Sequence, residues 1–239
     1  MNYLIVSVYY QILSYSRIKQ AVFYSLAFPV LLYVLFGSIW KTSGEAYAGF
    51  LLTGVIGMSI ASQGLFAVGP TLRSYYQTNF IKFLRNIPVS PLTHFMSLLI
   101  SRYSIILLGN IILFLIATFL FKYVLTLEEM IIIIAGSFIG LLLFSFLGLI
   151  IAFMSKKAES TRGFINLIYF TMIFTSDTYY PVTDINPVFS IWTRLLPLTP
   201  LLDFLRGNTE LNVVLYLLGW TVLFVIVFYF LFTKTSLSR

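Results

Sequence analysis

The stretch MIIIIAGSFIGLLLFSFLGLIIAFM, residues 130–154, decides the fold, because it is a long apolar run without a single charged side chain. A helix that crosses a bilayer needs about 20 mostly apolar residues. Its backbone must be helical there, since no water is present to satisfy free amide groups. Within the run, Gly136 and Gly140 form a G-x-x-x-G pair, a pattern typical of close packing between membrane helices.

The rest of the chain has the same character. Of its 239 residues 59% are hydrophobic and only 10% are charged, with a mean hydropathy of +0.96. Soluble domains carry about 25% charged residues. A soluble fold of this size leaves much of its surface in water, so it has no room to hide this much apolar area. The composition therefore predicts an integral membrane protein.

Six segments are long and apolar enough to be predicted as spans: 21–40, 47–69, 95–121, 130–154, 164–180 and 213–233. We therefore expect an all-α membrane protein in which residues 1–239 form one domain. With the N-terminus in the cytoplasm, 11 of the 15 lysines and arginines fall on the cytoplasmic side. The outer side receives Lys41, Lys122, Arg194 and Arg206. This positive-inside bias predicts cytoplasmic termini and explains the net charge of +7 without nucleic acid as a partner.

Residues 1–20 are predicted to form a helix in the membrane interface rather than a signal peptide, because the basic residues follow the apolar region. Ser7, Gln11, Ser14 and Arg17 lie along one polar stripe of that helix. An ordinary frayed terminus is the alternative.

The loop 70–91 has helical periodicity. Its apolar stripe consists of Leu72, Tyr76, Phe80, Phe83, Leu84 and Ile87. Arg73, Lys82 and Arg85 lie largely off that stripe, which is the pattern of an amphipathic helix. Pro88 ends this helix, and Pro91 suits the first position of a new one. The helix either rests on anionic lipid or docks a cytoplasmic partner, and the pattern alone leaves both open.

The outer segment 181–212 is interrupted by Pro181, Pro187, Pro197 and Pro200. Its pieces are apolar but too short to cross, so we expect re-entrant helices that dip into the outer leaflet. A cap lying on the surface is the alternative.

No site for catalysis or energy conversion stands out. There is no cysteine and one histidine, which excludes thiolate and multi-histidine metal sites. Glu128 and Glu129 are interpreted as a solvated charged turn. The chain lacks the G-x-x-x-x-G-K-[ST] phosphate loop. Arg102 lies near the inner end of its span, where its side chain can reach water. We therefore expect the energy for any transport to come from another subunit.

Several polar residues inside the predicted spans are candidates for a substrate pathway: Thr53, Ser59, Gln63, Asn110, Asn166 and Asp177. Polar groups in lipid are costly and face protein or a pathway. The alternative is hydrogen bonding between helices, or for Asp177 an interfacial position beside Tyr179 and Tyr180.

Two stretches carry a resemblance to a known family. LRNIPVSPLTHFMSLLISR, residues 84–102, is similar to the Arg–x–x–Pro–hydroxyl–Pro region that leads into the third span of type-2 ABC exporter permeases. RLLPLTPLLDFLRG, residues 194–207, resembles the proline-rich outer segment of the same family. The order of parts along the whole chain is similar as well.

The resemblance implies that the loop 70–91 is a coupling helix held by a separate ATP-binding subunit. It implies polar contacts from Arg73, Lys82 and Arg85, anchors at Phe80, Phe83 and Leu84, and a break at Pro88 and Pro91. ATP and Mg would be bound by that partner, and this chain would carry no cofactor. A second permease copy, or a similar permease, would complete a dimer.

The family further implies a bacterial plasma membrane and outward movement of a lipophilic or amphipathic compound, such as a drug, antibiotic or peptide. Export of a glycan or a lipid-linked substrate is also compatible with it. A non-transporting immunity or scaffold protein is the alternative from another class.

Overall fold

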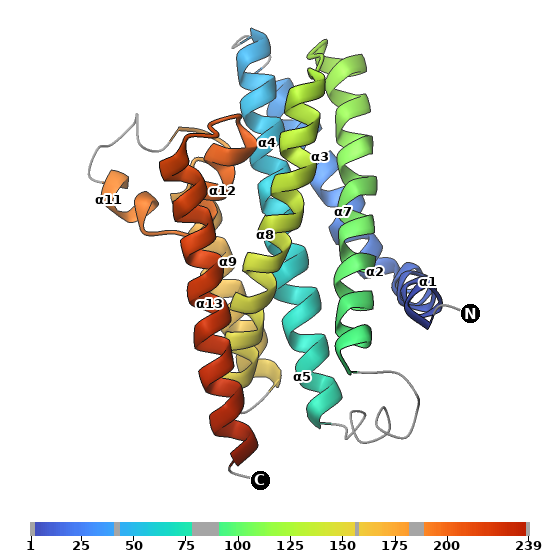
Figure 1. The fold of residues 1–239 in the computed structure, drawn as a ribbon. Coiled ribbons are helices and arrows are strands. Elements are labelled where there is room, and N and C mark those ends of the chain that lie inside the picture. The colour runs from blue at the N-terminus through green and yellow to red at the C-terminus, as the bar shows by residue number, and fades with distance from the viewer. Residues whose placement is uncertain (1–2, 41–43, 78–90, 156–157, 182–188, 238–239) are drawn as a thin grey trace.

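The computed structural model describes residues 3–40, 44–77, 91–155, 158–181 and 189–237. The helices are α1 (Tyr3–Ser16), α2 (Lys19–Val22), η1 (Phe23–Ala27), α3 (Phe28–Ile39), α4 (Gly44–Ser62), η3 (Gln63–Val68), α5 (Gly69–Gln77), α7 (Pro91–Phe121), α8 (Leu127–Met154), α9 (Ala158–Thr175), α11 (Phe189–Arg194), α12 (Leu198–Leu205) and α13 (Leu211–Leu237). The two η segments are π-helices inserted into longer helical rods. The long helices run side by side as a bundle (Figure 1).

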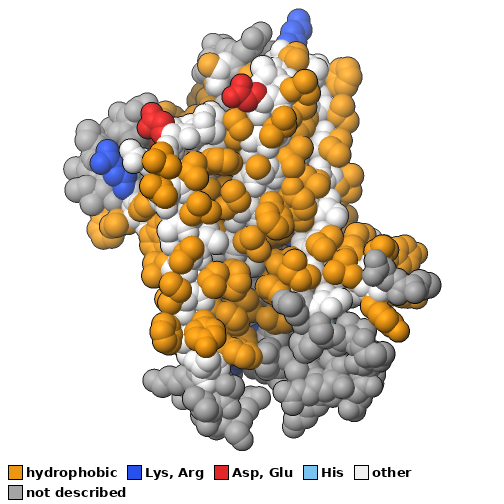
Figure 2. Space-filling view, viewed as in Figure 1, with side chains coloured by type: hydrophobic (Ala, Val, Ile, Leu, Met, Phe, Trp, Pro, Cys, Tyr) orange, Lys and Arg blue, Asp and Glu red, His pale blue; other side chains and the backbone are white. Residues whose placement is uncertain are grey.

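Five helical rods of the described residues are long and apolar enough to cross a membrane. They are Lys19–Ile39, Ala46–Tyr75, Thr93–Phe121, Leu127–Met154 and Leu211–Thr233. Each matches one of the predicted spans to within a few residues, except that the second rod continues six residues beyond its predicted end. Hydrophobic side chains cover most of the face in Figure 2, and the charged side chains visible there gather toward its upper end.

The predicted fifth span, 164–180, is not among these five helices, so the count of six is not reached. Its helix, α9, begins at Ala158, carries Glu159 and Arg162 in its early turns, and ends at Thr175. The apolar helical part is therefore only Phe164–Thr175, against the roughly 20 residues that a crossing needs. Residues 176–180 form turns and bends instead of continuing the helix.

Glycines allow the second rod and α8 to pack almost backbone to backbone. A Cβ atom built on Gly64 would lie 2.5 Å from the Cβ of Phe144. One built on Gly69 would lie 2.3 Å from the carbonyl carbon of Gly148. Real side chains do not tolerate such distances, so any other residue would force the two helices apart. This seam forms the centre of the core.

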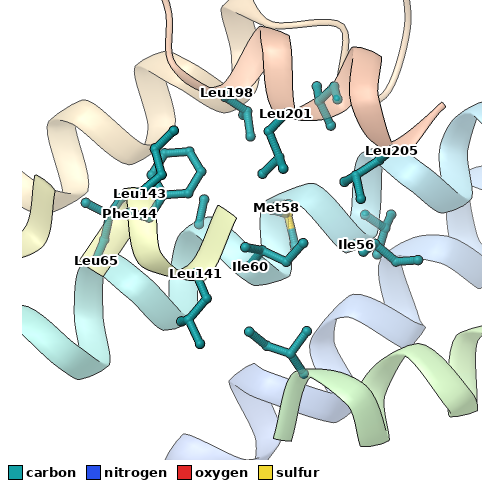
Figure 3. Close-up of a cluster of buried hydrophobic side chains, with 14 of the residues drawn as sticks. Ile56, Met58, Ile60, Leu65, Leu141, Leu143, Phe144, Leu198, Leu201 and Leu205 are labelled. Atoms are coloured by element: carbon teal, nitrogen blue, oxygen red, sulfur yellow. The ribbon is translucent and has the colours of Figure 1, made fainter. Parts of the chain in front are cut away.

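Helix α12 packs against the core beside α4 and α8. Leu198, Leu201 and Leu205 are buried; in Figure 3 Leu201 lies above Ile60, and Leu205 lies on the side of Ile56. The pair Gly136 and Gly140 faces this helix: Cβ atoms there would lie 2.7 Å from Leu205 and Leu201, respectively. The predicted close packing at the G-x-x-x-G pair is thus present, with α12 as the partner.

Helix α1 lies across the direction of the long helices and is seen end-on in Figure 1. Several of its apolar residues, including Tyr3, Ile5 and Tyr9, are exposed. Ser7 of the predicted polar stripe bonds to Ser97 of α7, with 2.7 Å between the hydroxyl oxygens. The stripe therefore faces α7 along part of its length, while Ser14 and Arg17 are exposed.

Candidate functional site

The predicted pathway residues do not form one site. Gln63 lies in a buried polar cluster between α1, η1 and η3. Thr53 borders a separate cavity beside α12. Ser59 is buried on α4. Asn110 of α7 donates from Nδ2 to the Ser137 hydroxyl of α8 at 3.1 Å, the contact expected of a residue that joins two helices.

Asn166 contradicts its interpretation as a buried polar residue, because its side chain is exposed on α9. Its neighbours Phe164, Leu167 and Phe170 are exposed as well. In the single chain α9 turns this face away from the other helices, and the pathway role of Asn166 stays a prediction. An amide on an apolar helix face is costly in lipid unless a partner covers it.

Gln63 links the two π-helices. Its Nε2 donates to the Ser25 hydroxyl of η1 at 2.6 Å and to the Tyr15 hydroxyl of α1 at 3.3 Å. Its Oε1 is buried and has no hydrogen-bond partner among the described residues. A π-turn inserts one residue into the helical ladder, and such turns are frequent at functional sites. The cluster therefore joins α1 to η1 and η3, the two segments in which the helical hydrogen-bond ladder is irregular.

Arg102 extends this cluster and corrects a prediction. It was expected to reach water from the inner end of α7, but it is 7% exposed. Its guanidinium carbon lies 4.1 Å from the centre of the Tyr15 ring, close enough for a cation–π contact. The side chain does not reach water because α1 crosses over it. Tyr15 thus contacts both Gln63 and Arg102.

Arg73, the one polar contact residue of the predicted coupling helix that is described, is bound within the chain. Its Nη1 donates to the carbonyl oxygen of Phe153 at 2.9 Å, and its Nη2 to that of Ser155 at 2.8 Å. These carbonyls lie at the C-terminal end of α8, where a cation also interacts favourably with the helix dipole. Arg73 therefore fastens α5 to the end of α8.

The other predicted coupling residues, Phe80, Lys82, Phe83, Leu84, Arg85 and Pro88, lie outside the described residues. Pro91 is the first residue of α7, as its helix-starting role predicts. The amphipathic pattern from Leu72 onward is helical in α5 as far as Gln77.

A cavity of about 250 Å³ lies between α4, α8, the end of α12 and the loop at Tyr123. Its lining residues are Ala46, Gly49, Phe50, Leu52, Thr53, Tyr123, Leu125, Glu129, Ile133, Leu205 and Arg206. Apolar walls with a few converging polar groups are the usual composition of a small-molecule site. Sequence reasoning found only Thr53 of this set.

The polar groups of the cavity are held in place by neighbouring atoms. Thr53 donates to the backbone oxygen of Phe50 at 2.9 Å. Glu129 accepts from the Tyr123 hydroxyl at 2.8 Å and from the Thr126 amide at 2.7 Å. The Glu129 contacts are part of a capping box that begins α8. Burial, followed by the Glu129 contact, raises the pKa of Tyr123 to about 12.

Arg206 is the cation of the cavity. Its guanidinium carbon lies 3.9 Å from the centre of the Phe50 ring, and Nη2 donates to the backbone oxygen of Asp177. Burial lowers the pKa of Arg206 to about 10, although Asp177 and Asp203 attract its charge. The same burial raises the pKa of Asp203. Asp177, a predicted pathway residue, thus contacts Arg206 through its backbone oxygen.

The fold and these contacts identify the chain as a multi-pass helical membrane protein whose polar groups lie largely between helices. Comparison with known families makes this specific. A family model described as the ABC-2 type transporter matches residues 3–209. The chain belongs to this family, and the resemblance to type-2 ABC permeases is confirmed. The family consists of transmembrane subunits that are not themselves catalytic and generally work with an ATP-binding subunit. No curated protein matches the chain.

Proposed function

We propose that this chain is the membrane subunit of an ATP-driven exporter that moves a lipophilic or amphipathic compound outward. A drug, an antibiotic or a peptide fits this description. The proposal places the chain in a bacterial plasma membrane with both termini in the cytoplasm. The observation that carries it is the family match over residues 3–209 on a bundle of apolar helices.

The contacts of Arg73 support a route for the driving force. The segment 78–90 joins α5 to α7, and Arg73 on α5 is bonded to the end of α8. A force applied to this segment by an ATP-binding subunit reaches α5 and α7 directly and α8 through Arg73. We therefore assign the grip of the partner to Phe80, Lys82, Phe83, Leu84 and Arg85, and the transmission to Arg73.

Two copies of the chain are part of the proposal. The exposed Asn166 supports a covered surface on α9, flanked by Phe164, Leu167 and Phe170. With a partner against this face, α9 is the fifth crossing of a six-span subunit, made shorter than its neighbours by the turn after Thr175. The helices α11 and α12 then form the re-entrant segment on the outer side.

The experiment is reconstitution of the chain with its ATP-binding subunit in lipid vesicles. We expect ATP-dependent movement of a fluorescent amphiphile and ATP hydrolysis that depends on the permease. Arg85→Glu reverses a charge in the proposed grip and should reduce binding of the partner and hydrolysis by at least tenfold. Arg194→Glu makes the same change on the exposed end of α11 and serves as the matched control.

Loss of partner binding in Arg85→Glu, with Arg194→Glu unchanged, supports the assignment. Full activity in both variants would show that the segment 78–90 is not the grip. A chain that forms no complex with any ATP-binding subunit would favour the non-transporting alternative.

A further inference from the structure

The cavity beside Arg206 has the features of a binding site for one class of molecule. It is lined by residues of α4, α8, the end of α12 and the loop at Tyr123, which are far apart in the sequence, so it exists only in the folded protein. Its 250 Å³ corresponds to about eight water molecules at ~30 Å³ each. It therefore accommodates a polar head and the first part of an apolar chain.

Arg206 borders this cavity with an incomplete set of hydrogen bonds. One face of the guanidinium is covered by Phe50, and Nη2 is bound to the Asp177 carbonyl. The Nε atom is buried and has no acceptor within the described part of the chain. A buried donor without an acceptor destabilises the folded state. Arg206 is the one cationic residue among those that line the cavity, so a ligand that enters meets its guanidinium.

The surrounding charges disfavour an anion as that acceptor. Asp177 and Asp203 already interact with the charge of Arg206, and Glu129 lies in the cavity wall. Two carboxyl groups thus interact with the guanidinium, and a third lines the same cavity. A further anion would be repelled by them, whereas an amine would have no lone pair to offer once protonated. An uncharged acceptor avoids repulsion from these carboxylates and, unlike a protonated amine, can accept from Arg206.

The other polar groups of the wall favour a donor beside that acceptor. The hydroxyl hydrogens of Thr53 and Tyr123 are engaged with the Phe50 carbonyl and with Glu129, respectively. Their oxygens keep free lone pairs, so both can accept from a ligand. A ligand group with a carbonyl oxygen and an N–H side by side can accept from Arg206 and donate to the hydroxyl oxygen of Thr53 or Tyr123.

We propose that this cavity binds the carboxamide group of an uncharged amphiphile, such as a peptide-like or N-acyl compound, with its carbonyl toward Arg206 and its apolar chain along Leu125, Ile133 and Leu205. That the bound molecule is also a transported compound rests on the proposed export function. Binding itself requires only the folded chain.

The test compares three probes with one apolar chain: octanamide, octanoate and octylamine. The full-length chain is placed in nanodiscs, and its thermal unfolding is followed as each probe is added, since a ligand that binds only the folded state raises Tm. Partitioning into lipid is the same for wild type and variants, so the difference between them isolates the site. We expect octanamide to raise Tm and the two charged probes to raise it much less.

Arg206→Met keeps the apolar stem and removes the donors, and we expect it to weaken octanamide binding at least tenfold. Arg194→Met on α11 is the matched control and keeps the wild-type response. Ala46→Trp fills the cavity from an exposed lining position without touching Arg206, and it should abolish the response even if Arg206→Met does not fold.

Equal octanamide responses in wild type and Ala46→Trp would overturn the proposal, as would stronger binding of octanoate than of octanamide. Because binding is measured on the chain alone, either result leaves the export function standing. Conversely, a failure of ATP-driven export in vesicles would leave an amide response in nanodiscs intact.

Discussion

Replacing Gly64 by alanine is the sharpest test of the seam between η3 and α8. The new Cβ would lie 2.5 Å from the Cβ of Phe144, 2.7 Å from its carbonyl carbon and 2.8 Å from the amide nitrogen of Ser145. Ordinary carbon–carbon contacts are about 3.5–4.0 Å. The shortfall is about 1 Å, and the opposing atoms belong to a helix backbone that has no rotamer to change.

The cost follows from the two ways in which the seam can respond. If the helices stay in place, overpacking costs typically 1–3 kcal/mol. If they separate, a gap of 0.5–1 Å forfeits about a quarter to a half of each dispersion contact along the seam. We therefore expect a loss of about 3 kcal/mol. For a chain of this size that lowers Tm by about 6–12 °C.

The assay is thermal unfolding in nanodiscs, with Gly219→Ala as the matched control. Gly219 also lies in a long apolar helix, α13, but nothing in the described structure lies within 4 Å of a Cβ built there. Alanine removes the entropy cost of glycine in a helix, so the control should gain about 0.5–1 kcal/mol. A Gly64→Ala protein as stable as wild type would refute the close packing of η3 against α8.

Three further predictions concern single polar contacts. Arg73→Lys replaces a guanidinium that donates to two carbonyls by a single ammonium group. We expect the free energy of unfolding to fall by about 1.5–3 kcal/mol, while Arg162→Lys on α9 leaves it unchanged. Burial raises the pKa of Asp203, so its carboxyl group holds a proton more tightly in the folded state than in the unfolded chain. The stability that this proton gives is present in acid and is lost as pH rises through the folded-state pKa. Asp203→Asn should therefore raise Tm at pH 7 and lose this advantage below pH ~4; an equal effect at both pH values contradicts the assignment. Asn110→Leu removes only a bond between α7 and α8, so stability should fall by about 0.6 kcal/mol and the range of exported compounds should stay the same.

Much of the fold is predictable because lipid imposes a simple rule on long apolar segments. The run at 130–154 becomes most of α8, and four other spans form as expected. Pro91 begins α7 as its fixed φ predicts. The fifth span differs because hydropathy does not register how the chain turns after Thr175, where the Asp177 carbonyl bonds to Arg206 on a distant helix.

The polar contacts were less predictable, because they depend on which helices meet. Gln63 was identified as a buried polar residue, but nothing in its neighbourhood indicates a π-helix or a partner on α1. Arg206 has the sequence context of an outer-loop cation and becomes a cavity residue only when α12 packs between α4 and α8. Gly207, which follows Arg206, has a φ of +88°, the left-handed conformation in which glycine commonly ends a helix.

The location of the segment 78–90 tests the central claim most directly, and a chain without cysteine suits the measurement. Asn86→Cys introduces the one thiol of the protein, which is then labelled from either side of the membrane. The account predicts labelling from the cytoplasmic side alone, with protection when the ATP-binding subunit is bound. Labelling from the outer side, or equal labelling with and without that subunit, would contradict it.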